Sequence, residues 1–481
     1  MKKTFTTLVF MICLFHIAFS AEQKNFKHEK LHNGLEVFTL ENTSTPLVYI
    51  EIAVRAGGIA QTEETAGLFH LYEHMMFKGN KKYPNAAAVQ SELAKMGVGT
   101  WNGSTAAEYV NYYFTIPSSL LKEGLEFWSY AIRYPLLQEQ ELANEKKVVL
   151  AEIEGGYGEP QKILGNAVYT YLFKDYPWRL DPGGTVDAIK NSTISQLKEI
   201  QKKYYIPKNA ALFIGGDINH KETLKLVKEI YGDWENPKNE QPITIPPQNS
   251  TPFSEPAFFV QGNSTVSPEM AEILVYYRGP DTRIDTASTY PADIWGSLIQ
   301  NPQGKFKKNF LSNAFLAIPS PEYVGGGYYT SGDAGRISFF GILLNPNNSI
   351  IERTQLFYDE LTSNFKQMQE ANYFSAEELK LVKMRLQDDA IIAMETTEGF
   401  LSQLRYWWSV TSTNYYLQYE KNMQKTSTGE IISFVEKYLI DKNPMIILVV
   451  NDAFLEKHKT QFLEKKFTII TDENAYWWKS K

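Results

Sequence analysis

The sequence predicts an α+β protein made of two similar domains in tandem. Three observations lead to this prediction. The chain is too long for one hydrophobic core, a proline-rich segment divides it near the middle, and short patterns recur on both sides of that segment. Strand-like and helix-like segments follow one another in mixed order, which is typical of layered α+β domains.

The clearest strand patterns are short, apolar runs bounded by turn residues, at 48–55, 110–116 and 210–215. Two longer segments, 189–204 and 220–231, repeat apolar residues at helical spacing and are predicted to be helices. The first half alone therefore contains the elements of a sheet covered by helices.

A segment with six prolines, residues 235–256, lies between the halves. Proline lacks a backbone donor and keeps the chain extended, so we predict a semi-rigid linker here. The predicted boundaries are a targeting segment at 1–20, a first domain at 21–234 and a second domain at 257–481.

The two predicted domains resemble a diverged internal repeat. Three pairs of segments correspond in order along the chain: 64–70 with 285–291, 108–113 with 335–340, and 213–217 with 448–452. The first pair places Pro291, Ile294 and Trp295 opposite His70, Glu73 and His74. The second copy therefore lacks the two imidazoles and the carboxylate of the first, so we expect the second domain to pack and to enclose whatever the first domain binds.

The N-terminus is predicted to be a secretory signal peptide. Lys2 and Lys3 precede an apolar run at 8–19, and residues 18–20 fit a small-x-small cleavage site. The apolar run is too short to be a convincing membrane span. Cys13 is the only cysteine, so the mature chain would have no disulfide. We therefore expect a periplasmic or secreted protein.

The charge balance argues against two classes of partner. The formal net charge is −7, and loss of the two lysines in residues 1–20 would change it to −9. This mild acidity disfavours nucleic acid and anionic lipid. No later segment reaches the length of a transmembrane run.

The most informative motif is the pentapeptide His70-Leu71-Tyr72-Glu73-His74. On a helix, His70 and His74 lie one turn apart on the same face and can bind one metal ion. Glu73 lies beside them, where its carboxylate can deprotonate a water molecule at the metal. H-x-x-E-H is the inverted form of the zinc-protease motif.

A catalytic zinc site usually has three protein ligands. The other five histidines do not fall in a second strongly patterned helix, so the third ligand is predicted to be a carboxylate. Residues 141–154 form a predicted helix in which Glu145 and Glu152, two turns apart, share a face. This pair is suited to a metal ligand and a supporting carboxylate. A solvated acidic face is the alternative.

Together these motifs resemble the M16 (pitrilysin-like) metallopeptidases, and in size the processing-peptidase-like subfamily with its exported bacterial members. The resemblance implies that His70, His74 and Glu152 bind one Zn²⁺ ion per chain. It also implies that Glu73 is the general base and that Glu145 orients a ligand. The fold implied is two α/β-layer domains that form half of a clamshell.

Residues 101–113 loosely match a family strand that lines the cleft. A substrate peptide would add as a strand along the edge near 100–114. The amide of Asn102 could then hold a substrate carbonyl. An ordinary strand-edge or turn asparagine is an equally good interpretation of this residue.

The chain departs from the family at one point. Many members carry an Arg and a Tyr, seven residues apart, that bind substrate and the developing oxyanion. The matching positions are Leu311 and Ile318, although Lys307 or Lys308 could lie close to them. Loss of one oxyanion donor typically costs about 2.7–4 kcal/mol of barrier lowering. We therefore expect a homologous partner subunit to supply the missing pair in a heterodimer, with a homodimer as the alternative.

The function expected from these residues is a zinc-dependent endopeptidase that cleaves peptides or unfolded protein segments, as the catalytic subunit of a dimer. The alternatives are a non-catalytic scaffold or partner-binding subunit, and a zinc-binding or storage module. A storage module would not require Glu73 beside the ligands. Cleavage of a fluorogenic peptide, alone and with a partner, separates the three.

Overall fold

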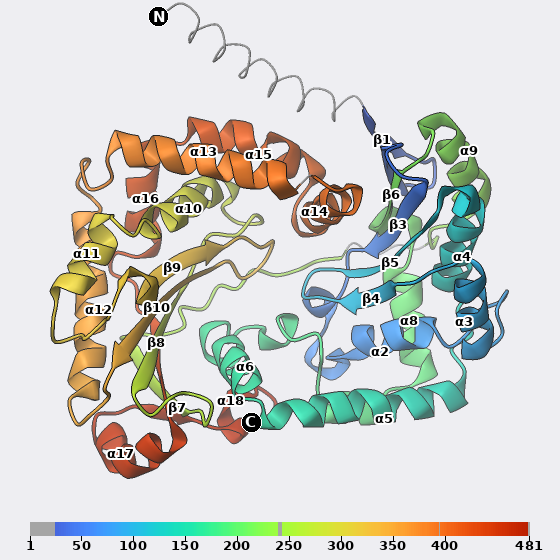
Figure 1. Ribbon diagram of the computed structural model, residues 1–481. Coiled ribbons are helices and arrows are strands. Elements are labelled where there is room, and N and C mark those ends of the chain that lie inside the picture. Colours follow the sequence, from blue (N-terminus) through green and yellow to red (C-terminus); the bar gives the residue numbers. More distant parts are fainter. Residues whose placement is uncertain (1–24, 239–242, 394, 480–481) are drawn as a thin grey trace, which may run out of the picture. The chain divides into compact units, whose positions relative to one another are not determined.

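The computed structural model describes residues 25–238, 243–393 and 395–479 (Figure 1). Each of two compact units contains one six-stranded mixed sheet and several helices. The predicted α+β class with two similar units in tandem is confirmed. The predicted signal peptide at 1–20 lies outside the described residues.

The first unit is built around a sheet with the strand order β1-β2-β6-β3-β5-β4. Only the β2–β6 pair is parallel. The central strands β3 and β6 are almost entirely buried because side chains cover both faces of the sheet. The strands are β1 (Phe26–Lys30), β2 (Glu36–Glu41), β3 (Leu47–Val54), β4 (Trp101–Thr105), β5 (Val110–Pro117) and β6 (Ala210–Gly216).

The second unit has a sheet with the order β12-β7-β11-β8-β10-β9. Strand β11 is buried throughout, whereas β8 and β10 alternate buried and partly exposed residues. The strands are β7 (Ala257–Gly262), β8 (Met270–Arg278), β9 (Val324–Tyr329), β10 (Arg336–Leu344), β11 (Met445–Val450) and β12 (Thr468–Ile470).

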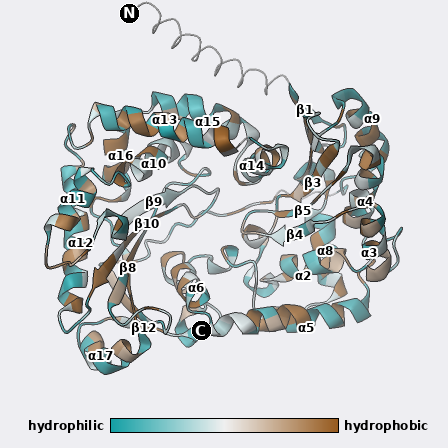
Figure 2. Cartoon of the chain, in the orientation of Figure 1, coloured by the Kyte–Doolittle hydropathy of each residue, from teal (hydrophilic) through white to brown (hydrophobic). Residues whose placement is uncertain are grey.

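Helices flank both sheets, and Figure 2 shows apolar strands such as β3 and β8 beside helices that combine polar and apolar stripes. Those mainly in the first unit are α2 (Leu68–Met76), α3 (Ala86–Lys95), α4 (Leu121–Arg133), α5 (Glu139–Gly155), α7 (Val186–Asn191), α8 (Ile194–Tyr204), α9 (His220–Tyr231) and α14 (Thr397–Val410). Those in the second are α6 (Pro160–Leu172), α10 (Thr286–Ile299), α11 (Lys305–Ser312), α12 (Ile350–Gln367), α13 (Ala376–Ala393), α15 (Thr413–Lys425), α16 (Thr428–Tyr438), α17 (Asp452–Glu464) and α18 (Asp472–Ala475). Within the described ranges, none of the helices has the length and apolar character needed to cross a bilayer.

Five strands of each sheet share one topology, whereas the sixth differs, because β1 pairs antiparallel with β2 and β12 pairs parallel with β7. Strands β2, β6, β3, β5 and β4 occupy the same order in the first sheet as β7, β11, β8, β10 and β9 in the second. The helices α2 and α10 both follow the antiparallel neighbour of the parallel pair, β3 in one unit and β8 in the other. This agreement supports the internal repeat read from the sequence.

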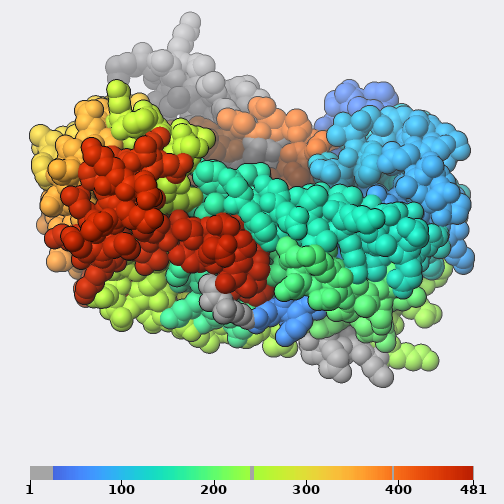
Figure 3. All heavy atoms as spheres, turned by 90° about the horizontal axis from the view of Figure 1, so that it is seen from below, coloured from blue at the N-terminus to red at the C-terminus, as the bar shows by residue number. Residues whose placement is uncertain are grey.

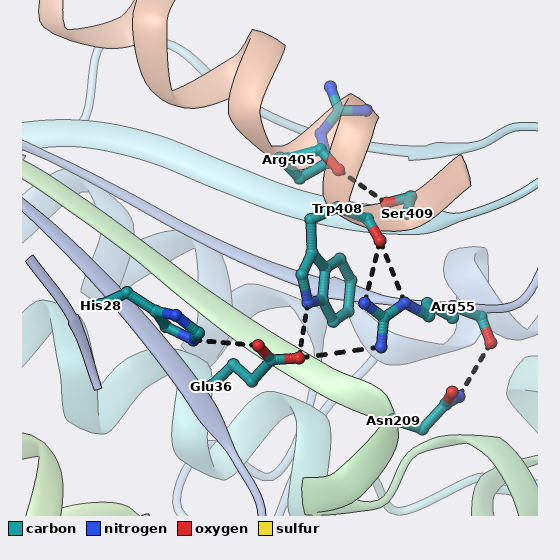
Figure 4. Close-up of polar contacts among 7 residues, drawn as sticks. All are labelled: His28, Glu36, Arg55, Asn209, Arg405, Trp408 and Ser409. Carbon is teal, nitrogen blue, oxygen red and sulfur yellow. Dashed lines mark hydrogen bonds and ion pairs between the residues drawn. The ribbon is translucent and has the colours of Figure 1, made fainter. Parts of the chain in front are cut away.

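Each unit also contains a segment from the other half of the chain. Residues 393–409, with most of α14, are counted in the first unit, and residues 150–181, with α6, in the second. Helix α14 contacts the first sheet through apolar side chains, such as Phe400 against Phe26, and also through charged and polar groups (Figure 4), whereas α6 packs in an apolar cluster with β7 and β11. The predicted continuous boundaries at 21–234 and 257–481 stay a prediction.

One local expectation needs correction. The predicted helix at 189–204 is two helices, α7 and α8, because Thr193 ends the run and caps α8 through a capping box with Gln196. The described part of the 235–256 segment contains no helix or strand. Two arginines hold its backbone: Arg179 donates to Pro246 O at 2.5 Å, and Arg278 donates to Ser250 O at 2.6 Å.

Candidate metal centre

Helix α2 places the histidine pair. It begins after Gly67, whose φ of +91° is a left-handed conformation and whose N–H donates to Gln61 Oε1 at 2.6 Å. A Cβ at Gly67 would lie 2.8 Å from Gly183 O, so this close approach requires glycine. One turn apart on α2, His70 and His74 bring their Nε2 atoms to 3.2 Å from each other.

Helix α5 supplies the carboxylates, and its atoms are among those coloured teal in Figure 3. Lys146 of α5 contacts the end of α7, where its ammonium group donates to Lys190 O and Ser192 O. The predicted helix at 141–154 is confirmed with slightly wider bounds. Glu145 is buried and Glu152 is exposed. The contact boundary between the units falls inside α5, but the helix is continuous, so Glu152 keeps its position relative to Glu145.

The structure brings together the three side chains that the sequence nominated as metal ligands. One ligand atom from each of His70, His74 and Glu152 lies within 4.8 Å of the others. Two nitrogen ligands of a tetrahedral zinc ion, each about 2.0–2.1 Å from it, lie about 3.3 Å apart. The observed 3.2 Å separation and the N, N, O donor set therefore fit zinc.

The protonation of His70 suits a ligand. Burial, with a smaller contribution from the nearby His74, lowers the pKa of His70 from 6.5 to about 4. At neutral pH the His70 ring is therefore uncharged and has a lone pair to offer.

Glu145 links the second histidine to a lysine. Its Oε2 lies 3.0 Å from His74 Nδ1, and its Oε1 lies 2.7 Å from Lys78 Nζ. When Nδ1 carries the imidazole proton it donates to this carboxylate, which leaves Nε2 free for a metal. This contact agrees with the orienting role predicted for Glu145.

Strand β4 holds Glu73. Thr105 Oγ1 donates to Glu73 Oε2 at 2.8 Å, and a Cβ at Gly103 would come within 2.9 Å of Glu73 Oε1. Gly103 therefore lets the strand approach the carboxylate. Because side chains alternate along a strand, Asn102 lies on the opposite face of β4 from Thr105 and is exposed. Its predicted substrate contact stays a prediction.

The two residues that depart from the family pattern, Leu311 and Ile318, lie in apolar surroundings in the structure. Leu311 is partly buried against the core of the second unit, and Ile318 is 8% exposed. Lys307, named as a possible substitute, is buried and donates to Pro321 O at 2.8 Å.

Sequence reasoning missed two residues of the site, Lys78 and Thr105. Thr105 had a usable signal, because it lies in the 101–113 segment that matched the strand lining the cleft. Lys78 follows His74 by four residues, but α2 ends at Met76, so helical spacing did not apply to it.

Comparisons with known proteins identify the family of the chain. Residues 36–181 match the family model described as insulinase (peptidase family M16), and residues 191–386 match that of the peptidase M16 inactive domain. An uncharacterized zinc protease of Rickettsia felis is 22% identical over 375 residues, which are 78% of this chain and 85% of that protein. The probable zinc protease PqqL of Haemophilus influenzae is 30% identical over 231 residues, 46% of this chain and 24% of that one.

Among solved structures, the periplasmic protease PqqL from Escherichia coli matches with a TM-score of 0.71 and 19% identity, over 90% of this chain and 48% of that one. The chain thus spans less than half the length of both PqqL proteins. Its fold and its relatives define a protein of the zinc metallopeptidase class. Within that class, the chain belongs to peptidase family M16.

Proposed function

We propose that this chain is a zinc-dependent endopeptidase that hydrolyses peptides or unfolded protein segments. The supporting observation is the approach of His70, His74 and Glu152 to within 4.8 Å, with Glu73 on the same turn of α2. Among the described residues this is the one group of three such side chains close enough to share a metal ion, which supports one Zn²⁺ per chain.

The residues divide the chemistry among them. When bound by His70, His74 and Glu152, zinc would lower the pKa of a water molecule toward about 7 and polarise the scissile carbonyl. Glu73 takes a proton from the attacking water and returns it to the leaving amine. Thr105 holds the Glu73 carboxylate by a hydrogen bond, and Glu145 fixes the ring of His74.

The substrate would bind as an added strand on β4. This strand pairs with β5 on one side only, so its other edge presents backbone donors and acceptors. Such pairing gives affinity without demanding a particular sequence. The exposed amide of Asn102 would hold a substrate carbonyl from the edge.

The oxyanion donors would come from a homologous partner subunit. Leu311 and Ile318 cannot donate hydrogen bonds, and a second copy of this chain would bring the same two apolar residues. A heterodimer with a chain that carries the Arg/Tyr pair is therefore favoured over a homodimer.

The proposed location is the periplasm or the exterior of the cell. The predicted signal peptide at 1–20 supports it, as does the structural likeness to a periplasmic protease.

The decisive experiment compares Glu73→Gln with the wild type after removal of residues 1–20. We expect the variant to keep one zinc per chain by metal analysis and to lose cleavage of a quenched fluorescent peptide by about 10²–10⁴-fold, because only the base is removed. Glu123→Gln, an exposed glutamate on α4, is the matched control. Retained turnover in Glu73→Gln would refute the assigned base.

A non-catalytic role is the second candidate, and the apolar pair Leu311 and Ile318 favours it for the isolated chain. Cleavage is therefore measured alone and with the co-purified partner. Zinc binding without cleavage in either setting would support the scaffold.

A further inference from the structure

Lys78 is the residue of the site that neither the sequence motif nor the family model assigns. Its Nζ lies 2.7 Å from Glu145 Oε1, while the other oxygen of that carboxylate contacts His74 Nδ1 at 3.0 Å. The Glu145 side chain is 7% exposed and that of Lys78 is 28% exposed. Little water therefore reaches the carboxylate, and these two contacts set its orientation.

The backbone holds Lys78 in place independently of its side chain. After α2 ends, the Lys78 N–H donates to Met75 O, and the next residue, Gly79, accepts from the Leu136 N–H at 3.1 Å. An isolated antiparallel bridge joins Asn80 to Pro135. These backbone contacts join the turn after α2 to the segment immediately before α5. The backbone at Lys78 is therefore held close to the start of the helix that carries Glu145.

We propose that Lys78 is a positioning residue of the metal centre, a role that rests on the proposed zinc site. Its ammonium group binds one oxygen of Glu145, so that the other oxygen faces His74. The His74 ring is then held with its proton on Nδ1 and its Nε2 lone pair toward the metal. Lys78 touches neither metal nor substrate and acts only through Glu145.

The charges around the centre explain why a lysine is useful there. Three carboxylates, Glu73, Glu145 and Glu152, lie on or beside the ligand group, and only Glu152 is assigned as a ligand. Without the ammonium group, Glu145 would repel the other two and could turn away from His74. Lys78 balances this charge and fixes Glu145 beside the histidine, so the metal centre keeps a single ligand set.

The test measures zinc affinity directly, by competition with a chromogenic chelator. Loss of a partner in the outer shell of a metal site typically weakens metal binding about 10–100-fold, and we expect this for Lys78→Met. Lys78→Arg, which keeps the charge and donors, should restore most of the affinity. Lys82→Met is the matched control, because Lys82 forms an equally short ion pair with Glu126, outside the site.

A double-mutant cycle separates positioning from other roles. If Lys78 acts through Glu145, Lys78→Met combined with Glu145→Gln should bind zinc no more weakly than Glu145→Gln alone. Losses that multiply, or a Lys78→Met affinity equal to that of the wild type, would overturn the proposal. Circular dichroism of each apoprotein confirms folding, and Lys78→Gln replaces Lys78→Met if that variant does not fold.

The readout also distinguishes this inference from the proposed function. A wild-type chain that binds no zinc would overturn both. Normal zinc binding and an inactive Glu73→Gln variant, with unchanged affinity in Lys78→Met, would overturn the role of Lys78 alone.

Discussion

Helices α2 and α10 occupy the same position in the two units, but α2 presents ring nitrogens to carboxylates and α10 packs into the core. In α2, the positions of His70 and His74 are only partly buried, and their ring nitrogens meet the carboxylates of α5. In α10 the corresponding Pro291 and Trp295 are buried, and Trp295 Nε1 lies 3.4 Å from Met368 Sδ within the core. A place in the fold therefore supports a metal only where the sequence leaves donor atoms uncovered and a second helix brings carboxylates to them.

A second contrast concerns the helix that each unit takes from the other half of the chain. Helix α6 packs Leu164, Ala167, Val168 and Leu172 with apolar residues of β7 and β11. Helix α14 instead uses Arg405, which donates to the fully buried Glu51 at 2.8 Å, and Trp408, which contacts Glu36 and Arg55 (Figure 4). Both attachments bury apolar surface, but α14 adds a buried ion pair and charged hydrogen bonds to its packing against Phe26 and Phe213.

The largest loss of stability should come from introducing the three motif residues of α2 at the corresponding positions of α10. We expect Pro291→His combined with Ile294→Glu and Trp295→His to bind no second zinc and to unfold at a much lower temperature. Truncation of a buried tryptophan to alanine costs about 3–5 kcal/mol, and we expect a large part of that cost for the smaller, polar histidine; a buried unpaired glutamate adds to it. Metal analysis and thermal unfolding measure the two outcomes.

Ile284→Glu is the control for this graft, because Ile284 is 62% exposed and should tolerate the charge. A grafted chain that holds two zinc ions at an unchanged unfolding temperature would show that the three residues alone separate the two units.

The second-largest effect should come from loss of the buried ion pair between Arg405 of α14 and Glu51 of β3. Arg405→Met leaves the Glu51 carboxylate at 0% exposure with hydrogen bonds from Asn111 and Tyr49 only. Removing one partner of a buried pair costs about 3–5 kcal/mol. We therefore expect amide exchange in α14 to rise by about 100- to 5000-fold, as measured by hydrogen–deuterium exchange.

Leu164→Ala provides the comparison for this variant, since a buried Leu→Ala change costs about 2–5 kcal/mol. It should raise exchange in α6 and leave α14 unchanged. Faster exchange in both helices after either substitution would mean that the two attachments are not independent.

The sequence predicted what is carried by local pattern. Periodicity located α9 and α5, and the spacing within 70–74 placed both imidazoles on one face. Local pattern could not predict contacts between residues that are far apart in the sequence. Glu51 and Arg405 are separated by 354 residues, so the glutamate inside strand β3 had no visible partner. The break between α7 and α8 was missed because apolar spacing continues across Thr193.

The smallest expected effect is the acid sensitivity of the α14 attachment. Burial alone would raise the pKa of Glu36, but hydrogen bonds with His28 and Trp408 and the charge of Arg55 lower it to about 2. Because this folded pKa lies below the unfolded value of about 4.3, the stability that Glu36 contributes is complete above that value and is lost as the pH falls toward 2.

The contribution of Glu36 is at most about 3 kcal/mol at neutral pH and should fall by about half at pH 3. The comparison is between the wild type and Glu36→Gln, which has no carboxylate to titrate, by thermal unfolding at pH 6 and pH 3. We expect a gap in unfolding temperature at pH 6 that narrows at pH 3. In a Leu164→Ala variant the gap from the wild type should not change between these pH values, since this substitution removes apolar packing and no charge. A gap for Glu36→Gln that is constant with pH would mean that the charge of Glu36 contributes nothing to the attachment of α14.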